Sequence, residues 1–160
     1  MPESKLSFDA ADVADTERLG AALAESLPER CVVALVGALG AGKTRLVQAT
    51  AEAAGVAAGS VVSPTFVLIQ EYHGRRSIYH FDAYRLKDDD EFLNLGPDEY
   101  FDSDGITFIE WADRVAHLLP QDRLEITIEP TGETERRITI NGTSPRINEL
   151  INRIRTACQF

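Results

Sequence analysis

Short apolar runs, separated by polar or glycine-containing links, recur along the chain and predict a series of β-strands. The runs are rich in Val, Ile, Leu and Phe, as buried strands usually are. The predicted strands span residues 31–36, 66–72, 77–81, 106–109, 124–129 and 136–141. The short polar link between the second and third of them favours an antiparallel hairpin.

Apolar residues at helical spacing predict helices between and around these strands. The first helix runs from about residue 16 to 27, with Leu19, Leu23 and Leu27 on one face and Asp15 as its N-terminal cap. The other predicted helices are 45–54, a short helix that starts in the acidic run 87–91, 112–119, and a last helix beginning at 144–145.

This order of strands and helices favours a three-layer α/β fold whose central sheet mixes parallel and antiparallel strands. The chain contains no linker, internal repeat or low-complexity stretch. We therefore expect residues 1–160 to form a single domain.

The charge balance limits the possible partners. The chain carries a formal net charge of -10, whereas proteins that hold nucleic acid by themselves present clustered Lys and Arg. Any role involving RNA is therefore expected to run through a partner protein. With neither a signal peptide nor an apolar run long enough to span a membrane, we expect a cytoplasmic protein without membrane contact.

Three minor features have simple structural interpretations. Cys31 and Cys158 lack metal-site spacing and are expected to act as small apolar residues. The segment 141–143 matches a glycosylation acceptor but, without a secretion signal, is interpreted as a turn. The acidic run 87–91 is expected to be a solvated face rather than a metal site.

The segment 37–44 reads Gly-Ala-Leu-Gly-Ala-Gly-Lys-Thr and fits the phosphate-binding pattern G-x-x-x-x-G-K-[ST]. A predicted strand precedes it and a predicted helix follows, which is the setting of a P-loop NTPase fold. Lys43 would reach the β- and γ-phosphates, and the Thr44 hydroxyl would ligate Mg²⁺. The nucleoside triphosphate is expected to contact Gly37, Leu39, Gly40, Ala41, Gly42, Lys43, Thr44 and Arg45.

Hydrolysis needs further groups, which cluster at the carboxyl ends of strands beside a P-loop. Glu110 ends the apolar strand 106–109, as a Walker B acid near Mg²⁺ does, although a strand-end acid can also simply face solvent. Asp82 ends the strand 77–81 and is a candidate for ordering the attacking water or a metal-bound water. Thr65, in the loop 63–66, could contact the γ-phosphate in the manner of a switch segment. His80 is interpreted as packing against the sheet.

These motifs together resemble the TsaE (YjeE) family. The glycine loop 37–44, Ser-Pro-Thr-Phe at 63–66, His-Phe-Asp-Ala-Tyr-Arg-Leu at 80–86 and Ile-Glu-Trp at 109–111 occur in the family's order and spacing. The resemblance extends from about residue 19 to 141. It implies an ATPase required for threonylcarbamoyladenosine modification of adenosine 37 in tRNA. It also implies action with the partners TsaB and TsaD, which carry out the transfer while the ATPase resets them between cycles.

The resemblance also implies roles for individual residues. Lys43, Asp82 and Glu110 would form the catalytic set, Thr44 and Glu110 would belong to the metal site, and Trp111 would lie near the nucleotide. The sequence departs from the family pattern at Ala38, where Asp is common, and at Arg45, where a second Thr is frequent.

Two other functions use the same phosphate-binding loop. A small-molecule kinase would need an acceptor site, and Arg136 with Arg137 could be imagined as its phosphate-clamping lid, although no acceptor-binding insertion is evident. A nucleotide-gated binding module would hydrolyse little ATP until its partners were present. A regulatory GTPase is disfavoured because no Asn-Lys-x-Asp motif is found. Tyr84 and Arg85 are interpreted as ordinary surface groups.

Overall fold

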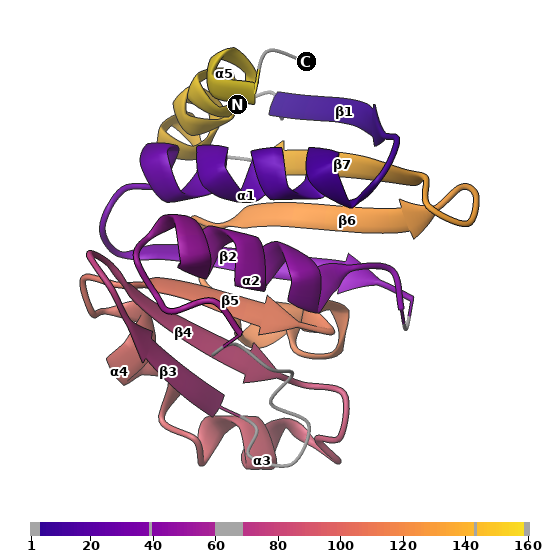
Figure 1. The fold of residues 1–160 in the computed structure, drawn as a ribbon. Coiled ribbons are helices and arrows are strands. Elements are labelled where there is room, and N and C mark those ends of the chain that lie inside the picture. The colour runs from indigo at the N-terminus through magenta and orange to yellow at the C-terminus, as the bar shows by residue number, and fades with distance from the viewer. Residues whose placement is uncertain (1–3, 39, 60–68, 143, 159–160) are drawn as a thin grey trace.

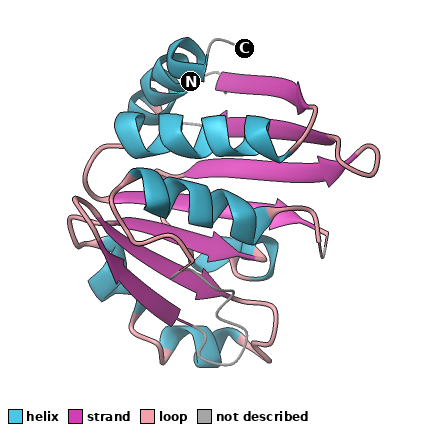
Figure 2. Cartoon of the chain, in the orientation of Figure 1, coloured by secondary structure: helices cyan, strands magenta, loops and turns pink. Residues whose placement is uncertain are grey.

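A computed structural model describes residues 4–38, 40–59, 69–142 and 144–158. Seven strands form one sheet in the order β1-β7-β6-β2-β5-β4-β3 (Figures 1 and 2). Strand β2 pairs in parallel with β5 and β6, β4 pairs in parallel with β5, and the remaining pairs are antiparallel. The prediction of a mixed sheet is thus confirmed. The strands are β1 Ser4–Ala10, β2 Cys31–Gly37, β3 Ile69–His73, β4 Ser77–Asp82, β5 Ile106–Glu110, β6 Leu124–Pro130 and β7 Arg136–Gly142.

Helices cover both faces of the sheet and make the three layers. Helices α1, α2 and α5 lie across one face (Figure 1) and share a buried apolar cluster with it. A second buried cluster on the other face joins Val32, Phe81 and Ile109 of the sheet to Phe92 of α3 and Phe101 of α4. The helices are α1 Val13–Ser26, α2 Lys43–Ala53, α3 Asp89–Leu93, α4 Pro97–Phe101 and α5 Pro145–Cys158. In the part of the chain that is described, no helix has the length and apolar character needed to cross a membrane.

Helix α1 begins earlier than the sequence pattern predicted, and Asp15 is not its cap. Asp12 is the cap, because its side chain accepts a hydrogen bond from the Asp15 backbone N–H. Asp15 instead reaches back and accepts from the Ala11 N–H at 2.9 Å. The two carboxylates thus satisfy donors at the helix start that have no intrahelical acceptor.

Three other elements differ from the sequence prediction. Segment 112–119 forms two short 3₁₀ helices, Ala112–Arg114 and Ala116–Leu118, rather than one α-helix. Its buried residues Ala112, Val115 and Leu119 follow spacings of three and four residues, which is why the sequence pattern favoured an α-helix. Strand β1 and helix α4 were not predicted from the sequence, while residues 66–68 of a predicted strand lie outside the described residues.

Gly142 lies in β7, so the interpretation of 141–143 as a turn is wrong for its first two residues. A Cβ at Gly142 would lie 1.9 Å from Ile147 Cγ2 in α5. We expect Gly142→Ala to lower the free energy of unfolding by about 1–3 kcal/mol, because the buried Ile147 must shift. Urea unfolding measures the change. Gly132→Ala is the control, since its Cβ would meet only the flexible Glu135 side chain; equal stability of the two variants would contradict the prediction.

The strand register positions the site. Asp82 pairs with Glu110, and Glu110 pairs with Leu35, two residues before the end of β2. Because β2, β4 and β5 are parallel, their carboxyl ends meet at one edge of the sheet. The glycine loop, Asp82 and Glu110 therefore lie together.

Candidate functional site

The glycine loop joins the end of β2 to the start of α2, as the motif predicted. Gly40 and Gly42 adopt φ values of 79° and 113°, a region that side-chain-bearing residues rarely enter. Gly37 serves a different purpose, because a Cβ there would lie 2.5 Å from the carbonyl oxygen of Ile128 in β6. Leu39 lies outside the described residues. The loop delivers the first N–H groups of α2, which have no intrahelical acceptor, to one point.

Lys43 is the buried cation of the site, with 4% of its surface exposed. Its Nζ donates hydrogen bonds to the carbonyl oxygens of Gly37 at 2.5 Å and Ala38 at 3.0 Å. Burial lowers the pKa of Lys43, while the nearby carboxylates of Glu110 and Asp82 act in the opposite direction. The ammonium is thus held at the base of the loop, where phosphate oxygens are expected to bind.

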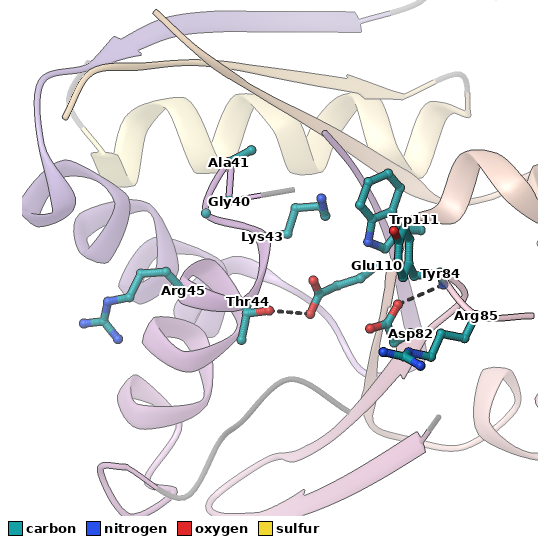
Figure 3. Close-up of a pocket in the computed structure, with 11 residues that line it drawn as sticks. Gly40, Ala41, Lys43, Thr44, Arg45, Asp82, Tyr84, Arg85, Glu110 and Trp111 are labelled. Carbon is teal, nitrogen blue, oxygen red and sulfur yellow. Dashed lines mark hydrogen bonds between the residues drawn. The ribbon is translucent and has the colours of Figure 1, made fainter. Parts of the chain in front are cut away.

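Thr44 and Glu110, which both line the cavity, are hydrogen bonded to each other. The Thr44 hydroxyl donates to Glu110 Oε2 at 2.8 Å (Figure 3), and Glu110 is almost fully buried. With its hydrogen engaged, the hydroxyl oxygen keeps lone pairs for a cation, and Glu110 keeps its other oxygen. Hydroxyl and carboxylate oxygens are the ligands that Mg²⁺ prefers. The two residues therefore fit the Mg²⁺ site that the sequence predicted, and Glu110 does not face solvent.

Asp82 is buried beside Glu110 at the end of β4. The pKa of Asp82 is raised, mainly because the carboxylate is buried, and the nearby charge of Glu110 adds to this effect. The Tyr84 N–H, which donates to Oδ1 at 2.9 Å, acts in the opposite direction. One oxygen is thus fixed by the backbone. A carboxylate placed in this way can accept a hydrogen bond from a water in the cavity.

These residues line a single cavity of about 520 Å³ (Figure 3). Tyr84 and Arg85, which were interpreted as ordinary surface groups, are exposed and also line it. Their position directly after the strand-end Asp82 could have indicated this. Arg45 lines the cavity, but its guanidinium pairs with Glu17 of α1 at 2.6 Å and points away from Glu110 and Asp82. The cavity is lined by Gly40, Ala41, Gly42, Lys43, Thr44, Arg45, Asp82, Tyr84, Arg85, Glu110 and Trp111.

Thr65, with the rest of segment 63–66, lies outside the described residues, so its expected contact with the γ-phosphate stays a prediction. Among the described residues, no group of three or more His, Cys, Asp and Glu side chains could hold a metal ion. In the acidic run, Asp88 caps α3 by accepting from the Glu91 N–H, and Asp89 and Asp90 are exposed. This agrees with a solvated acidic face.

Trp111 follows Glu110 in a left-handed conformation, with φ of 58°. Its ring lies 4.8 Å from that of Tyr84, and Lys43 Nζ lies 4.0 Å from its centroid. A cation over an aromatic face is held by the ring's electron density. The only tryptophan of the chain thus touches the residue expected to bind phosphate.

We expect ATP binding to change the fluorescence of Trp111, because bound phosphates compete with the ring for Lys43. Titration of the protein with ATP, followed by tryptophan emission, measures the change. Trp111→Phe should remove the signal while calorimetry still detects binding. Unchanged emission at an ATP concentration that calorimetry shows to be saturating would contradict the arrangement.

Comparison with known proteins identifies the family of this chain. The family model described as threonylcarbamoyl adenosine biosynthesis protein TsaE matches residues 10–138. The TsaE protein of Bacillus subtilis is 43% identical over 120 residues, covering 74% of each chain. That of Treponema pallidum is 40% identical over 126 residues, covering 79% of this chain and 93% of its own. The crystal structure of Bacillus subtilis YdiB superposes with a TM-score of 0.81 at 30% identity, covering 98% of this chain and 97% of its own. The chain therefore belongs to the TsaE family of threonylcarbamoyl adenosine biosynthesis proteins.

Proposed function

We propose that this chain is a Mg²⁺-dependent ATPase that serves the threonylcarbamoyladenosine modification of tRNA. Membership of the TsaE family supports the pathway. The main observation in support of the ATPase activity is the hydrogen bond between Glu110 and Thr44, which directly follows the glycine loop. It joins the phosphate-binding helix to a strand-end carboxylate, as a Mg²⁺-nucleotide site requires.

The residues divide the work of hydrolysis. The glycine loop and the start of α2 bind the phosphates through backbone N–H groups, and Lys43 neutralises the β- and γ-phosphates. Thr44 and Glu110 would hold Mg²⁺, which would supply charge neutralisation at the phosphate oxygens. Asp82 accepts a hydrogen bond from the attacking water and orients it. Trp111 and Tyr84 contribute aromatic side chains to the lining of the cavity.

A second cavity of about 140 Å³ adjoins the first and supports a place for the nucleoside. The two cavities share Ala41, Gly42 and Arg45. Since Lys43 marks the β- and γ-phosphate end, the α-phosphate and nucleoside extend the other way along the loop. The second cavity is also lined by Asp12, Val13, Thr16, Glu133, Thr134 and Arg136.

We further propose that the ATPase acts in the cytoplasm with TsaB and TsaD and resets these partners between cycles of transfer. The net charge of -10 is consistent with contact to tRNA only through the complex. A kinase lid built on Arg136 and Arg137 is disfavoured. Arg136 donates to the Ala41 carbonyl at 3.0 Å and Arg137 to Asp9 at 3.1 Å, so both guanidinium groups are engaged in the fold.

Phosphate release from ATP, measured for the purified chain alone and with TsaB and TsaD, tests the proposal. Turnover that needs Mg²⁺ and rises with the partners is expected. ATP binding with turnover only in their presence would identify a nucleotide-gated module of the same pathway. Turnover that needs a small-molecule acceptor and ignores both partners would identify a kinase instead and overturn the proposal.

A further inference from the structure

His80 lies fully buried in β4, two residues before Asp82. Alternation along a strand places the side chains of both on the same face of the sheet. In the register of β4 and β5, His80 pairs with Phe108, which lies two residues before Glu110. Glu110 therefore shares that face, on which α2 and Thr44 pack. His80 Nε2 is hydrogen bonded to Glu110 Oε2.

Two donors thus converge on one oxygen of Glu110. The carboxylate only accepts hydrogen bonds, so the Thr44 hydroxyl and the His80 ring both donate to Oε2. Oε1 is the oxygen left for a cation in the cavity. Without the ring, Thr44 alone would hold the carboxylate, and rotation about its last bond could exchange the two oxygens.

The two hydrogen bonds to Oε2 also keep the Glu110 carboxylate from pairing with Lys43. Its ammonium is close enough to Glu110 to interact electrostatically with it, and opposite charges in a buried site attract strongly. No ion pair joins Lys43 and Glu110, however; Glu110 is hydrogen bonded to Thr44 and His80 instead. The restraint keeps the carboxylate on the Thr44 side and leaves Lys43 for phosphate.

Packing alone does not account for a histidine here. His80 Nδ1 is buried and has no hydrogen-bond partner among the described residues. A buried polar atom without a partner costs stability, and the apolar neighbours Ile78 and Phe81 in the same strand fill their sites without that cost. The contact with Glu110 is what an apolar residue at this position could not make.

We propose that His80 is a positioning residue that fixes the Glu110 carboxylate for Mg²⁺ by donating from Nε2. This inference rests on the proposed function, since it concerns the same metal site. Residues that hydrogen bond to metal ligands typically contribute about 10- to 100-fold in metal affinity. His80 should therefore affect the Mg²⁺ requirement and leave metal-free nucleotide binding unchanged.

The test is the Mg²⁺ dependence of binding of a non-hydrolysable ATP analogue, measured by calorimetry with magnesium chloride and again with EDTA. His80→Leu should raise the Mg²⁺ concentration for half-maximal effect by about 10-fold or more, with unchanged affinity in EDTA. His80→Gln, which keeps an N–H near the position of Nε2, should restore most of the Mg²⁺ affinity. Thr107→Val is the matched control, because it removes the other buried polar atom without a partner among the described residues, on the opposite face of β5.

The outcomes separate this inference from the proposed function. A wild-type chain that binds no analogue under either condition would overturn both. If Mg²⁺ strengthens binding of the analogue to the wild-type chain, and His80→Leu shows the same Mg²⁺ dependence, only the inference would be overturned. If His80→Leu loses affinity for the analogue equally with Mg²⁺ and with EDTA, the role of His80 is merely structural and the inference is overturned.

A measurement on the wild-type chain covers the case in which His80→Leu fails to fold. The chain has three histidines, so nitrogen-15 spectra of the imidazole rings are simple to assign. We expect His80 to carry its hydrogen on Nε2, with Nδ1 unprotonated. A hydrogen on Nδ1 alone would mean that the ring cannot donate to Glu110 and would overturn the proposal.

Discussion

Replacing Lys43 with alanine is expected to lower ATP turnover by about a hundredfold or more. The ammonium is the buried cation of the cavity, and removing one preorganised group that stabilises transition-state charge typically costs about 10²–10³ in rate. Affinity for ATP should also fall, because Lys43 would contact the phosphates before reaction as well. Steady-state phosphate release and calorimetry measure the two effects separately.

The matched control is Lys87→Ala, which changes the charge equally at an exposed position. It should behave as the wild type. Lys43 also anchors its own loop through the Gly37 and Ala38 carbonyls, so thermal unfolding must show that Lys43→Ala is folded. Unchanged turnover in a folded Lys43→Ala variant would remove the assignment of the glycine loop as the phosphate site.

Glu110→Gln is expected to reduce Mg²⁺-dependent hydrolysis by about two orders of magnitude, because it removes the one full charge from the pair of proposed metal ligands in a buried site. The amide oxygen can still accept from Thr44, so the fold and metal-free nucleotide binding should persist. Hydrolysis rates measured across a range of Mg²⁺ concentrations separate weaker metal binding from a slower chemical step. A requirement for Mg²⁺ identical to that of the wild type would make Glu110 structural.

Glu129 offers a close control for this experiment. It lies near the end of β6, which neighbours β2 in parallel as β5 does, but its side chain is exposed. Glu129→Gln should leave hydrolysis unchanged. A similar loss in both variants would mean that the general negative charge of this sheet edge, rather than metal contact by Glu110, supports turnover.

The sequence predicted the elements that carry strong periodicity. Strands β2 and β5 are largely buried on both faces, and their continuous apolar runs were easy to recognise. Strand β1 was missed because it lies at the sheet edge, with only Leu6, Phe8 and Ala10 alternating with polar residues. Helix α4 is a single turn between Gly96 and Asp102, too short for helical periodicity to develop.

The site residues that could be predicted are those whose role follows from their own side chain and their place in a local motif. Lys43, Thr44, Asp82 and Glu110 follow from the glycine loop and from the ends of parallel strands, and the structure brings all four together. The partner of His80 was not predictable. Its contact with Glu110 depends on the register of β4 against β5, which no pattern within either strand reveals.

The order of strands has a consequence for folding during synthesis. Strand β2, which leads into the glycine loop, pairs with β5 and β6, and both lie far downstream in the chain. The pairing of β2 on both of its sides therefore cannot be completed on the ribosome until residue 130, the end of β6, has emerged. Pairings across such long sequence separations slow folding because much of the chain must be ordered before they form. A nascent chain that stops short of β6 leaves the apolar β2 without one of its two neighbouring strands and vulnerable to aggregation.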